Sequence, residues 1–548
     1  MATLAFMGVV ARAADLLGNV PAAQQPGLLR IRGEDLRANV FFLASDALQG
    51  RMSLQPGDEA AVRWIAAEFA KAGLEPAGED PAGHASYVQT VPLIEFRPNR
   101  DATSLSLQRG GQLLHYQMPD AIGSFNDDIE VSGPLVFAGF GITAPGLGYD
   151  DYRGLDVKDK IVLIFEHEPQ ETDPHSKFNG TGNTRYATAR VKALNAQAHG
   201  ARALLIAGEP NRRHPSLLDL HEHVGANQVR VIPLPSQSIA DDELHVPIVH
   251  VSDALCETLL SGAHATPQAL QSGIDKDLSM HSQPVSDSVV TLHLENKSRM
   301  LGVTQNVAGL LRGSDAALAA ETVIISAHHD HDGVALNGSG YLDVFHGADD
   351  NASGIAGVVE LAYAFSANPV RPKRSILFVV FGAEERGLLG AFYMSTHPLR
   401  PLATTRALVN LDMIGRDEAP SEHTDGIMQV PGNTTNRLNL IGSTYSPELR
   451  HTVTQANSAI GLDLDDRFDR DHALNFLFRG DQFPFMLQDI PALWFFTGLH
   501  PDYHRATDTA DKINYPKMLK IVQLSYVSLW LLADQAAYPK FIPDPEGN

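Results

Sequence analysis

The stretch Thr322-Val-Ile-Ile-Ser-Ala-His-His-Asp-His-Asp332 turns from apolar to polar residues at position 328. Its apolar part has the length of one strand, and a continuous apolar run predicts a strand that is covered on both faces. Similar runs at 375–381, 407–411 and 492–496 predict three more buried strands. Helical patterns at 353–365 and 513–536 alternate with them. This alternation predicts an α/β fold with a mixed, largely parallel sheet flanked by helices.

Acidic residues and histidines follow the predicted strands directly. They are His328, Asp330, Glu384, Glu385 and Asp412, and Asp349 precedes the helix at 353–365. Because ligands bind at the carboxyl ends of strands in open α/β sheets, we expect these side chains to meet at one rim. Any one of them alone could be an ordinary turn or helix-capping residue. Several carboxylates in one place would repel one another, however, unless cations lay between them.

The residue types in this pattern favour zinc. Imidazole and carboxylate groups ligate zinc, and the presence of one cysteine, Cys256, excludes both a thiolate-rich site and an intramolecular disulfide. Two ions about 3.5–4 Å apart would polarise a carbonyl group and hold a bridging water molecule as a nucleophile. The pattern therefore indicates metal-assisted hydrolysis, with manganese or cobalt as alternatives to zinc in vitro.

The composition is that of a globular protein with an acidic surface. The 65 acidic residues outnumber the 42 basic residues, and the net charge is −23. Such a surface repels phosphate backbones, so nucleic acid is not an expected partner. No apolar run approaches the roughly 20 residues that a membrane-spanning helix needs, so we expect no membrane span.

The chain of 548 residues is too long for one core and divides into regions of different pattern. Residues 1–14 resemble the tail of a secretory signal peptide, which would make the protein secreted or periplasmic; an ordinary N-terminal segment is the alternative. Residues 28–115 and 296–540 are expected to form one domain. Residues 116–290, with short β-like runs between Gly- and Pro-rich turns, are expected to form a β-rich domain inserted into it.

Five motifs give the chain a resemblance to a known family. They are Ser326-Ala-His-His-Asp-His331, Gly347-Ala-Asp-Asp-Asn-Ala-Ser-Gly-Ile355, Phe381-Gly-Ala-Glu-Glu-Arg-Gly-Leu-Leu-Gly390, Val409-Asn-Leu-Asp-Met-Ile-Gly-Arg416 and Tyr503-His-Arg-Ala-Thr-Asp-Thr509. Together they resemble the M28 family (clan MH) of di-zinc aminopeptidases. Residues 43–51 are also similar to this family, and residues 116–290 resemble the protease-associated (PA) domain often inserted in it. The resemblance implies a zinc-exopeptidase fold, of the phosphorylase/hydrolase-like type, and peptide substrates.

The resemblance also implies five zinc ligands, which are His328, Asp349, Glu385, Asp412 and His504. Asp349 would bridge both ions and would be joined to Asp350 by a cis peptide. His328 and Asp412 would complete one site, and Glu385 and His504 the other. His500 remains an alternative to His504, because spacing alone does not exclude it.

Two residues are implied to act beside the metal ligands. Glu384 would be the general base that takes a proton from the bridging water molecule and passes it to the leaving amine. Asp330 would orient the ring of His328. The expected activity is that of an aminopeptidase. A carboxypeptidase or dipeptidase on the same scaffold is the first alternative, and it would need an Arg for the free carboxylate of the substrate. A receptor-like relative without catalysis is the second alternative, because fold alone does not fix function.

Overall fold

The computed structural model describes residues 20–545 except 81, 118–119, 217–218 and 220–232. The predicted signal segment at residues 1–14 lies outside the described residues. Of the helices within the described part of the chain, none combines the length and the apolar character needed to cross a bilayer.

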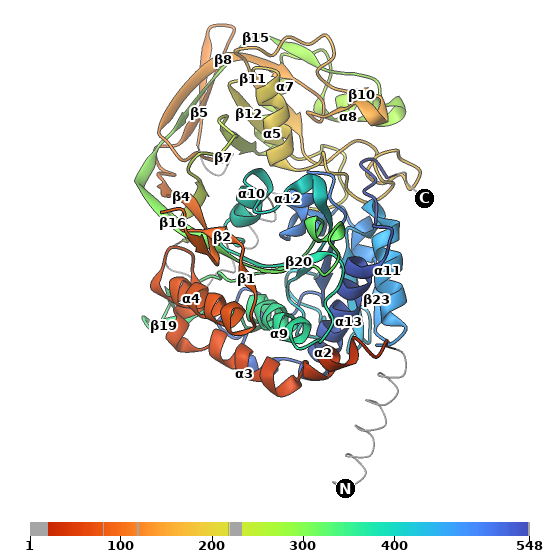
Figure 1. Cartoon of the computed structure of the whole chain (residues 1–548). Coiled ribbons are helices and arrows are strands. Elements are labelled where there is room, and N and C mark those ends of the chain that lie inside the picture. The colour runs from red at the N-terminus through yellow and green to blue at the C-terminus, as the bar shows by residue number, and fades with distance from the viewer. Residues whose placement is uncertain (1–19, 81, 118–119, 217–218, 220–232, 546–548) are drawn as a thin grey trace.

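A mixed sheet forms the centre of the larger domain (Figure 1). Its strand order is β13-β4-β16-β20-β17-β21-β24-β22-β23, and β1 pairs with β16. Four neighbouring strands in the middle run parallel: β20 (Ser375–Phe381), β17 (Thr322–His328), β21 (Thr405–Leu411) and β24 (Ala492–Phe496). The outer strands, paired mostly antiparallel, are β13 (Ser236–Ile239), β4 (Val88–Pro98), β16 (Asn296–Leu311), β22 (Arg437–Ile441), β23 (Asp463–Asp465) and β1 (Glu75–Pro76). The predicted α/β fold with a mixed sheet is confirmed.

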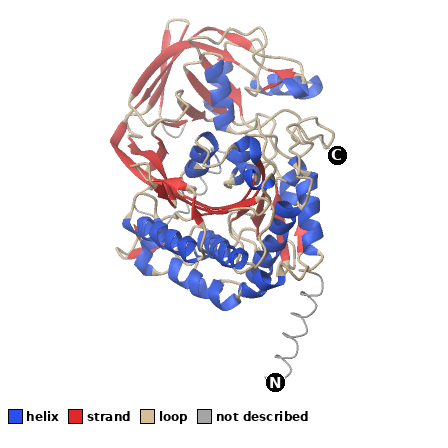
Figure 2. Ribbon diagram, viewed as in Figure 1, coloured by secondary structure: helices blue, strands red, loops and turns tan. Residues whose placement is uncertain are grey.

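Helices cover both faces of this sheet (Figure 2). Val323 and Ile325 of β17 point into the core on one face, while Ile324 points into the core on the other. The helices of the first core are α3 (Gly33–Leu43), α4 (Pro56–Lys71), α9 (Gly354–Ser366), α11 (Pro447–Asn457) and α13 (Tyr515–Asp534), and α2 (Gln25–Arg30) lies beside α9. Those of the second are α10 (Leu389–Thr396) and α12 (Gln482–Met486). Burial on both faces explains why these strands have continuous apolar runs.

A second sheet forms the inserted domain, at the top of Figure 1. In order across the sheet its strands are β6 (Gln112–Tyr116), β5 (Ser104–Arg109), β15 (Gln283–Leu294), β8 (Ile129–Phe137), β11 (Ile161–Phe165), β12 (Ala203–Ala207), β14 (Ile248–Val251) and β7 (Ala121–Ser124). The described part of this domain includes the helices α5 (Ala189–Ala198), α7 (Asp253–Leu260) and α8 (Pro267–Asp277). Short strand pairs elsewhere are β2 (Gly78–Glu79) with β3 (Ala85–Ser86), β9 (Thr143–Ala144) with β10 (Tyr149–Asp150), and β18 (Val334–Leu336) with β19 (Leu342–Val344).

The inserted domain begins earlier than the boundary expected at residues 115 and 116. β5 falls within residues 28–115 and β6 begins there, yet β5 pairs with β15 of the second sheet, and Leu105 and Leu107 lie in the core of that domain. Gly110 and Gly111 form the turn of this hairpin, and both have the positive φ that a two-residue hairpin turn favours. In the opposite sense, β13 falls within residues 116–290 but pairs with β4 of the larger sheet. Each region therefore contributes strands to the other domain.

The paired strands β4 and β16 of the larger sheet connect it to the second sheet. A single residue, Glu295, separates the end of β15 from the start of β16. β16 then pairs with β4 from Ser298–Arg97 to Val307–Val88. The two domains are thus joined by a hydrogen-bonded ribbon.

Candidate metal centre

The parallel strands of the larger sheet deliver polar side chains to one edge. His328 ends β17, Glu384 and Glu385 follow β20, and Asp412 follows β21. His504 lies in the loop after β24. His328 is fully buried, and Asp412 and Glu384 are only 4% and 9% exposed. The side chains are therefore gathered in one enclosed place at the carboxyl ends of the strands.

Asp350 lies at the centre of this cluster. Its Oδ1 atom is 3.2 Å from Nε2 of His328, and its Oδ2 atom is 3.1 Å from Nε2 of His504. Oδ1 of Asp412 is 3.4 Å from the same nitrogen of His328. Oε2 of Glu385 is 3.2 Å from the same nitrogen of His504. The two oxygens of one carboxylate thus face two separate pairs of histidine and carboxylate.

The expectation that Asp349 bridges two metals is wrong. Oδ1 of Asp349 accepts a hydrogen bond from the backbone N–H of Gly415 at 2.6 Å, and its Oδ2 atom is 3.3 Å from Nε2 of His500. The cis peptide likewise joins Asp350 to Asn351 and not Asp349 to Asp350. Adjacent side chains point in different directions at this turn, so Asp349 and His500 face each other outside the cluster.

Two residues hold the turn that carries Asp350. Oδ2 of Asp508 accepts hydrogen bonds from the backbone N–H groups of Asp349 and Asp350, at 2.9 and 3.2 Å. The buried guanidinium of Arg51 donates to the carbonyl oxygens of His329 and Gly347, at 2.9 and 3.0 Å. Arg51 thereby fastens the loop after β17 to the turn before α9. Sequence reasoning gave neither residue a role, although both lie in stretches that carried the family resemblance.

Asp330 acts differently from the expectation. Nδ1 of His328 lies 3.2 Å from the backbone carbonyl oxygen of Asp330 and 3.8 Å from its carboxylate. The carboxylate instead accepts hydrogen bonds from the backbone N–H groups of Glu384 and Glu385, at 2.9 and 3.2 Å. The main chain of Asp330 therefore orients the ring of His328, and its side chain fixes the turn after β20.

Two further residues of the polar run at residues 328–332 join the cluster. Nδ1 of His331 is 2.6 Å from Oε1 of Glu385, and Oδ2 of Asp332 is 3.4 Å from Nδ1 of His504. Sequence reasoning did not select them, because a run of five polar residues after a strand does not show which side chains turn inward. The signal available was their position in the same polar run as His328.

The cluster has the chemistry of a divalent-cation site. Nε2 of His328 and Oδ1 of Asp412 are buried without a hydrogen-bond partner, although buried polar atoms in proteins nearly always have one. Burial raises the pKa of Glu384 well above its usual value, and the nearby His328 offsets this only in part. Such crowding of carboxylates in a low-dielectric site is relieved by a cation. Imidazole and carboxylate donors fit zinc.

A pocket opens onto this cluster. The residues of its wall outside the cluster are Met413, Phe476, Arg479, Trp494, Phe496, Leu499 and Tyr503. Arg479 donates a hydrogen bond to the hydroxyl of Tyr503 at 3.0 Å, and its guanidinium lies 5.2 Å from the ring centre of Phe476. A bound molecule would therefore meet carboxylates and histidines on one side, aromatic rings on another, and the cation of Arg479.

Comparisons with known proteins agree with this fold. Residues 306–528 match the model of peptidase family M28, and residues 131–259 match that of the PA domain. Aminopeptidase YwaD of Bacillus subtilis is 24% identical over 62% of this chain and 59% of its own length. A "Probable zinc metalloprotease" of Pyrenophora teres f. teres is 35% identical over 18% of this chain and 24% of its own length. The alignments thus span less than two thirds of either relative.

A solved structure shares the fold of the whole chain. It is the aminopeptidase from Aneurinibacillus sp. strain AM-1, with a TM-score of 0.50 and 19% identity over 95% of this chain and 98% of that one. The sheet, its helices and its acidic rim define an α/β protein with a candidate metal centre at the carboxyl ends of its parallel strands. Residues 306–528 thus match peptidase family M28, and the PA domain matched at residues 131–259 precedes this region.

Proposed function

We propose that the protein is an aminopeptidase that binds two zinc ions and releases residues from the N-termini of peptides. The observation that carries the proposal is the position of Asp350, whose two oxygens face His328 and His504 separately. The match of residues 306–528 to the M28 family model and the similarity to YwaD, which is named an aminopeptidase, support it.

Five side chains would hold the zinc ions. His328 and Asp412 would serve one ion, Glu385 and His504 the other, and Asp350 both. Bound zinc supplies polarisation of the peptide carbonyl group and activation of water at neutral pH.

Glu384 would act as the general base. Its side chain lies in the pocket, with Oε2 3.8 Å from Nε2 of His328. Its backbone is fixed by Asp330. A carboxylate held in this way accepts a proton from the attacking water and returns it to the leaving amine.

A Glu384→Gln variant tests this role. The amide keeps the shape of the side chain but does not accept the proton. We expect retained zinc, measured by elemental analysis, and a fall in kcat of at least about 100-fold on an aminoacyl-nitroanilide. Unchanged turnover would exclude Glu384 as the base, and loss of zinc would show that it is a ligand instead.

Arg479 favours a second candidate, an exopeptidase that also requires a free carboxylate near the cleaved bond. It lies in the pocket wall beside Tyr503 and is paired with that hydroxyl rather than with a carboxylate. A guanidinium is the side chain best suited to bind a carboxylate with two hydrogen bonds. Dipeptides or C-terminal residues would then be the substrates.

Matched substrates distinguish the candidates. A dipeptidase cleaves a dipeptide much faster than the same dipeptide with an amidated C-terminus, and Arg479→Met raises KM for the first by about 10-fold or more without affecting the second. An N-blocked dipeptide is cleaved only by a carboxypeptidase. Equal rates on free and amidated dipeptides leave the aminopeptidase alone.

A further inference from the structure

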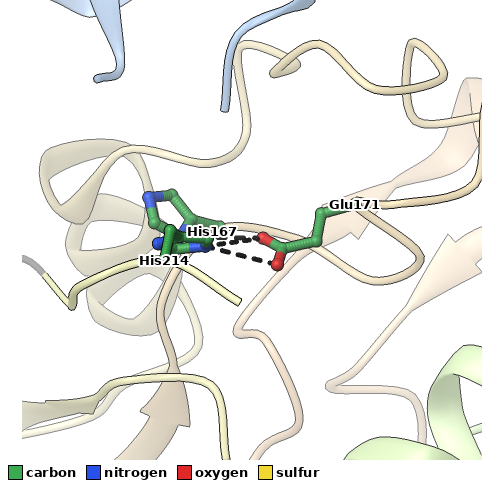
Figure 3. A group of neighbouring side chains, drawn as sticks. All are labelled: His167, Glu171 and His214. Atoms are coloured by element: carbon green, nitrogen blue, oxygen red, sulfur yellow. Dashed lines mark hydrogen bonds and ion pairs between the residues drawn. The ribbon is translucent and has the colours of Figure 1, made fainter. Parts of the chain in front are cut away.

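A second cluster of histidines and carboxylates lies in the inserted domain, far from the catalytic motifs in sequence. Figure 3 shows His167, Glu171 and His214 with their polar ends turned toward one another. His167 follows β11, and Glu209 follows the neighbouring parallel strand β12. The carboxyl ends of adjacent parallel strands therefore gather polar groups here, as they do in the larger sheet.

The distances within this cluster suit metal ligation. Nε2 of His214 is 3.2 Å from Oε1 of Glu171, and Nδ1 of His167 is 4.0 Å from Oε2 of the same carboxylate. One ligand atom from each of the three residues lies within 4.8 Å of the other two. In a tetrahedral site, zinc–ligand bonds of about 2.1 Å place two ligand atoms about 3.4 Å apart. The distances of 3.2 and 4.0 Å lie on either side of this value. The side chains of His167, Glu171 and His214 are 2%, 8% and 5% exposed.

His214 is oriented as a metal ligand is. Its Nδ1 atom lies 2.8 Å from the backbone carbonyl oxygen of Pro215, to which it donates a hydrogen bond. The lone pair of the neutral ring is then on Nε2, the atom that faces Glu171. Metal-binding histidines use their other ring nitrogen in this way.

A buried carboxylate oxygen of Glu209 without a hydrogen-bond partner also favours a metal site. Nδ1 of His167 is 2.7 Å from Oε1 of Glu209, while Oε2 of Glu209 is fully buried and has no hydrogen-bond partner. A divalent cation bound nearby would stabilise these buried carboxylates.

The cluster also touches the peptidase domain. His472, in the loop before η8 (Phe476–Phe478), packs edge-on against His214 with ring centres 5.3 Å apart. Nε2 of His167 lies 3.0 Å from the side-chain amide of Asn475. A ligand held here would therefore sit at the boundary between the two domains.

We propose that His167, Glu171 and His214 bind a divalent transition-metal ion of the zinc class, at a site separate from the catalytic cluster. The bound ion stabilises the inserted domain and its contact with the loop at residues 472–475. This inference does not depend on the proposed peptidase activity.

Metal content of the full-length protein tests the proposal. Wild type, Glu171→Gln and His214→Gln are saturated with zinc, dialysed and analysed. His245→Asn, which removes an exposed histidine of the same domain outside the cluster, is the matched control. We expect about one zinc equivalent per chain fewer in the two cluster variants than in wild type and control. Zinc should also raise the Tm of wild type and control by about 2 °C more than that of the variants.

Equal zinc content and equal Tm shifts in all four proteins would overturn the proposal. If the cluster variants do not fold, crystals of the wild type grown with zinc decide the question. An anomalous peak about 2.1 Å from Nε2 of His214 supports the site, and density that fits only direct contact between His214 and Glu171 refutes it.

Discussion

Replacing Asp350 with asparagine should abolish metal binding. The two oxygens of Asp350 lie 3.2 and 3.1 Å from Nε2 of His328 and His504, so an amide would present an NH₂ group to one of them and carry no charge. Changing a residue that merely supports a metal ligand costs 10–100-fold in affinity or activity. A ligand shared by two sites should cost more, at least about 10³-fold in kcat/KM, or about 4 kcal/mol.

Asp349→Asn is the matched control, because it makes the same chemical change one residue away. The amide oxygen can still accept the hydrogen bond from Gly415 N–H, and only the 3.3 Å contact with His500 is altered. We expect full zinc content and less than about a 10-fold loss in kcat/KM, since one polar contact is exchanged for another.

Zinc analysis and aminoacyl-nitroanilide kinetics measure both variants, and circular dichroism verifies that each is folded. A folded Asp350→Asn protein with wild-type zinc and activity would refute the assignment. Loss of both in Asp349→Asn would restore Asp349 as the bridging residue.

Three further predictions concern the buried residues Asp330, Arg51 and Asp151. Asp330→Asn should lower kcat by about 10-fold or more with zinc retained, because its carboxylate fixes the backbone of Glu384. An unchanged kcat would contradict this. Arg51→Lys should reduce the free energy of unfolding by about 3 kcal/mol, because a lysine ammonium cannot make the several hydrogen bonds of the buried guanidinium. Urea denaturation measures the change, and the variant Arg63→Lys, at an exposed position, should leave the stability unchanged. Burial raises the pKa of Asp151 to about 7, so the folded state holds this proton more tightly than the unfolded state, and stability should fall as pH rises from about 4 to about 7. Asp151→Asn should remove that slope and gain up to about 4 kcal/mol at pH 8; equal Tm differences between pH 5 and pH 8 in both proteins would show the shift to be absent.

The central strands were predictable because their physics is local. A strand covered on both faces needs apolar residues at every position, and the run at 322–327 corresponds to β17 (Thr322–His328). The polar residues that follow such strands were equally predictable as a group, because parallel strands end at one edge. The domain boundary was not, since the pairing of β5 with β15 joins residues about 180 positions apart.

The choice between Asp349 and Asp350 could not be made from the sequence. Both precede α9, and only the backbone geometry of the turn decides which carboxylate reaches His328 and His504. The supports of that turn, Asp508 and Arg51, come from opposite ends of the chain. Contacts of this kind depend on tertiary structure and leave no periodic pattern in the sequence.

The ribbon of β4 and β16 limits how the two domains can move. A single linker would let the inserted domain rotate about a few backbone bonds. The hydrogen bonds between β4 and β16 oppose such a rotation because it would break them. A change in the angle between the domains would therefore have to bend the paired strands β4 and β16. We therefore expect the inserted domain to make small, reversible movements rather than the large rotations of domains joined by a hinge.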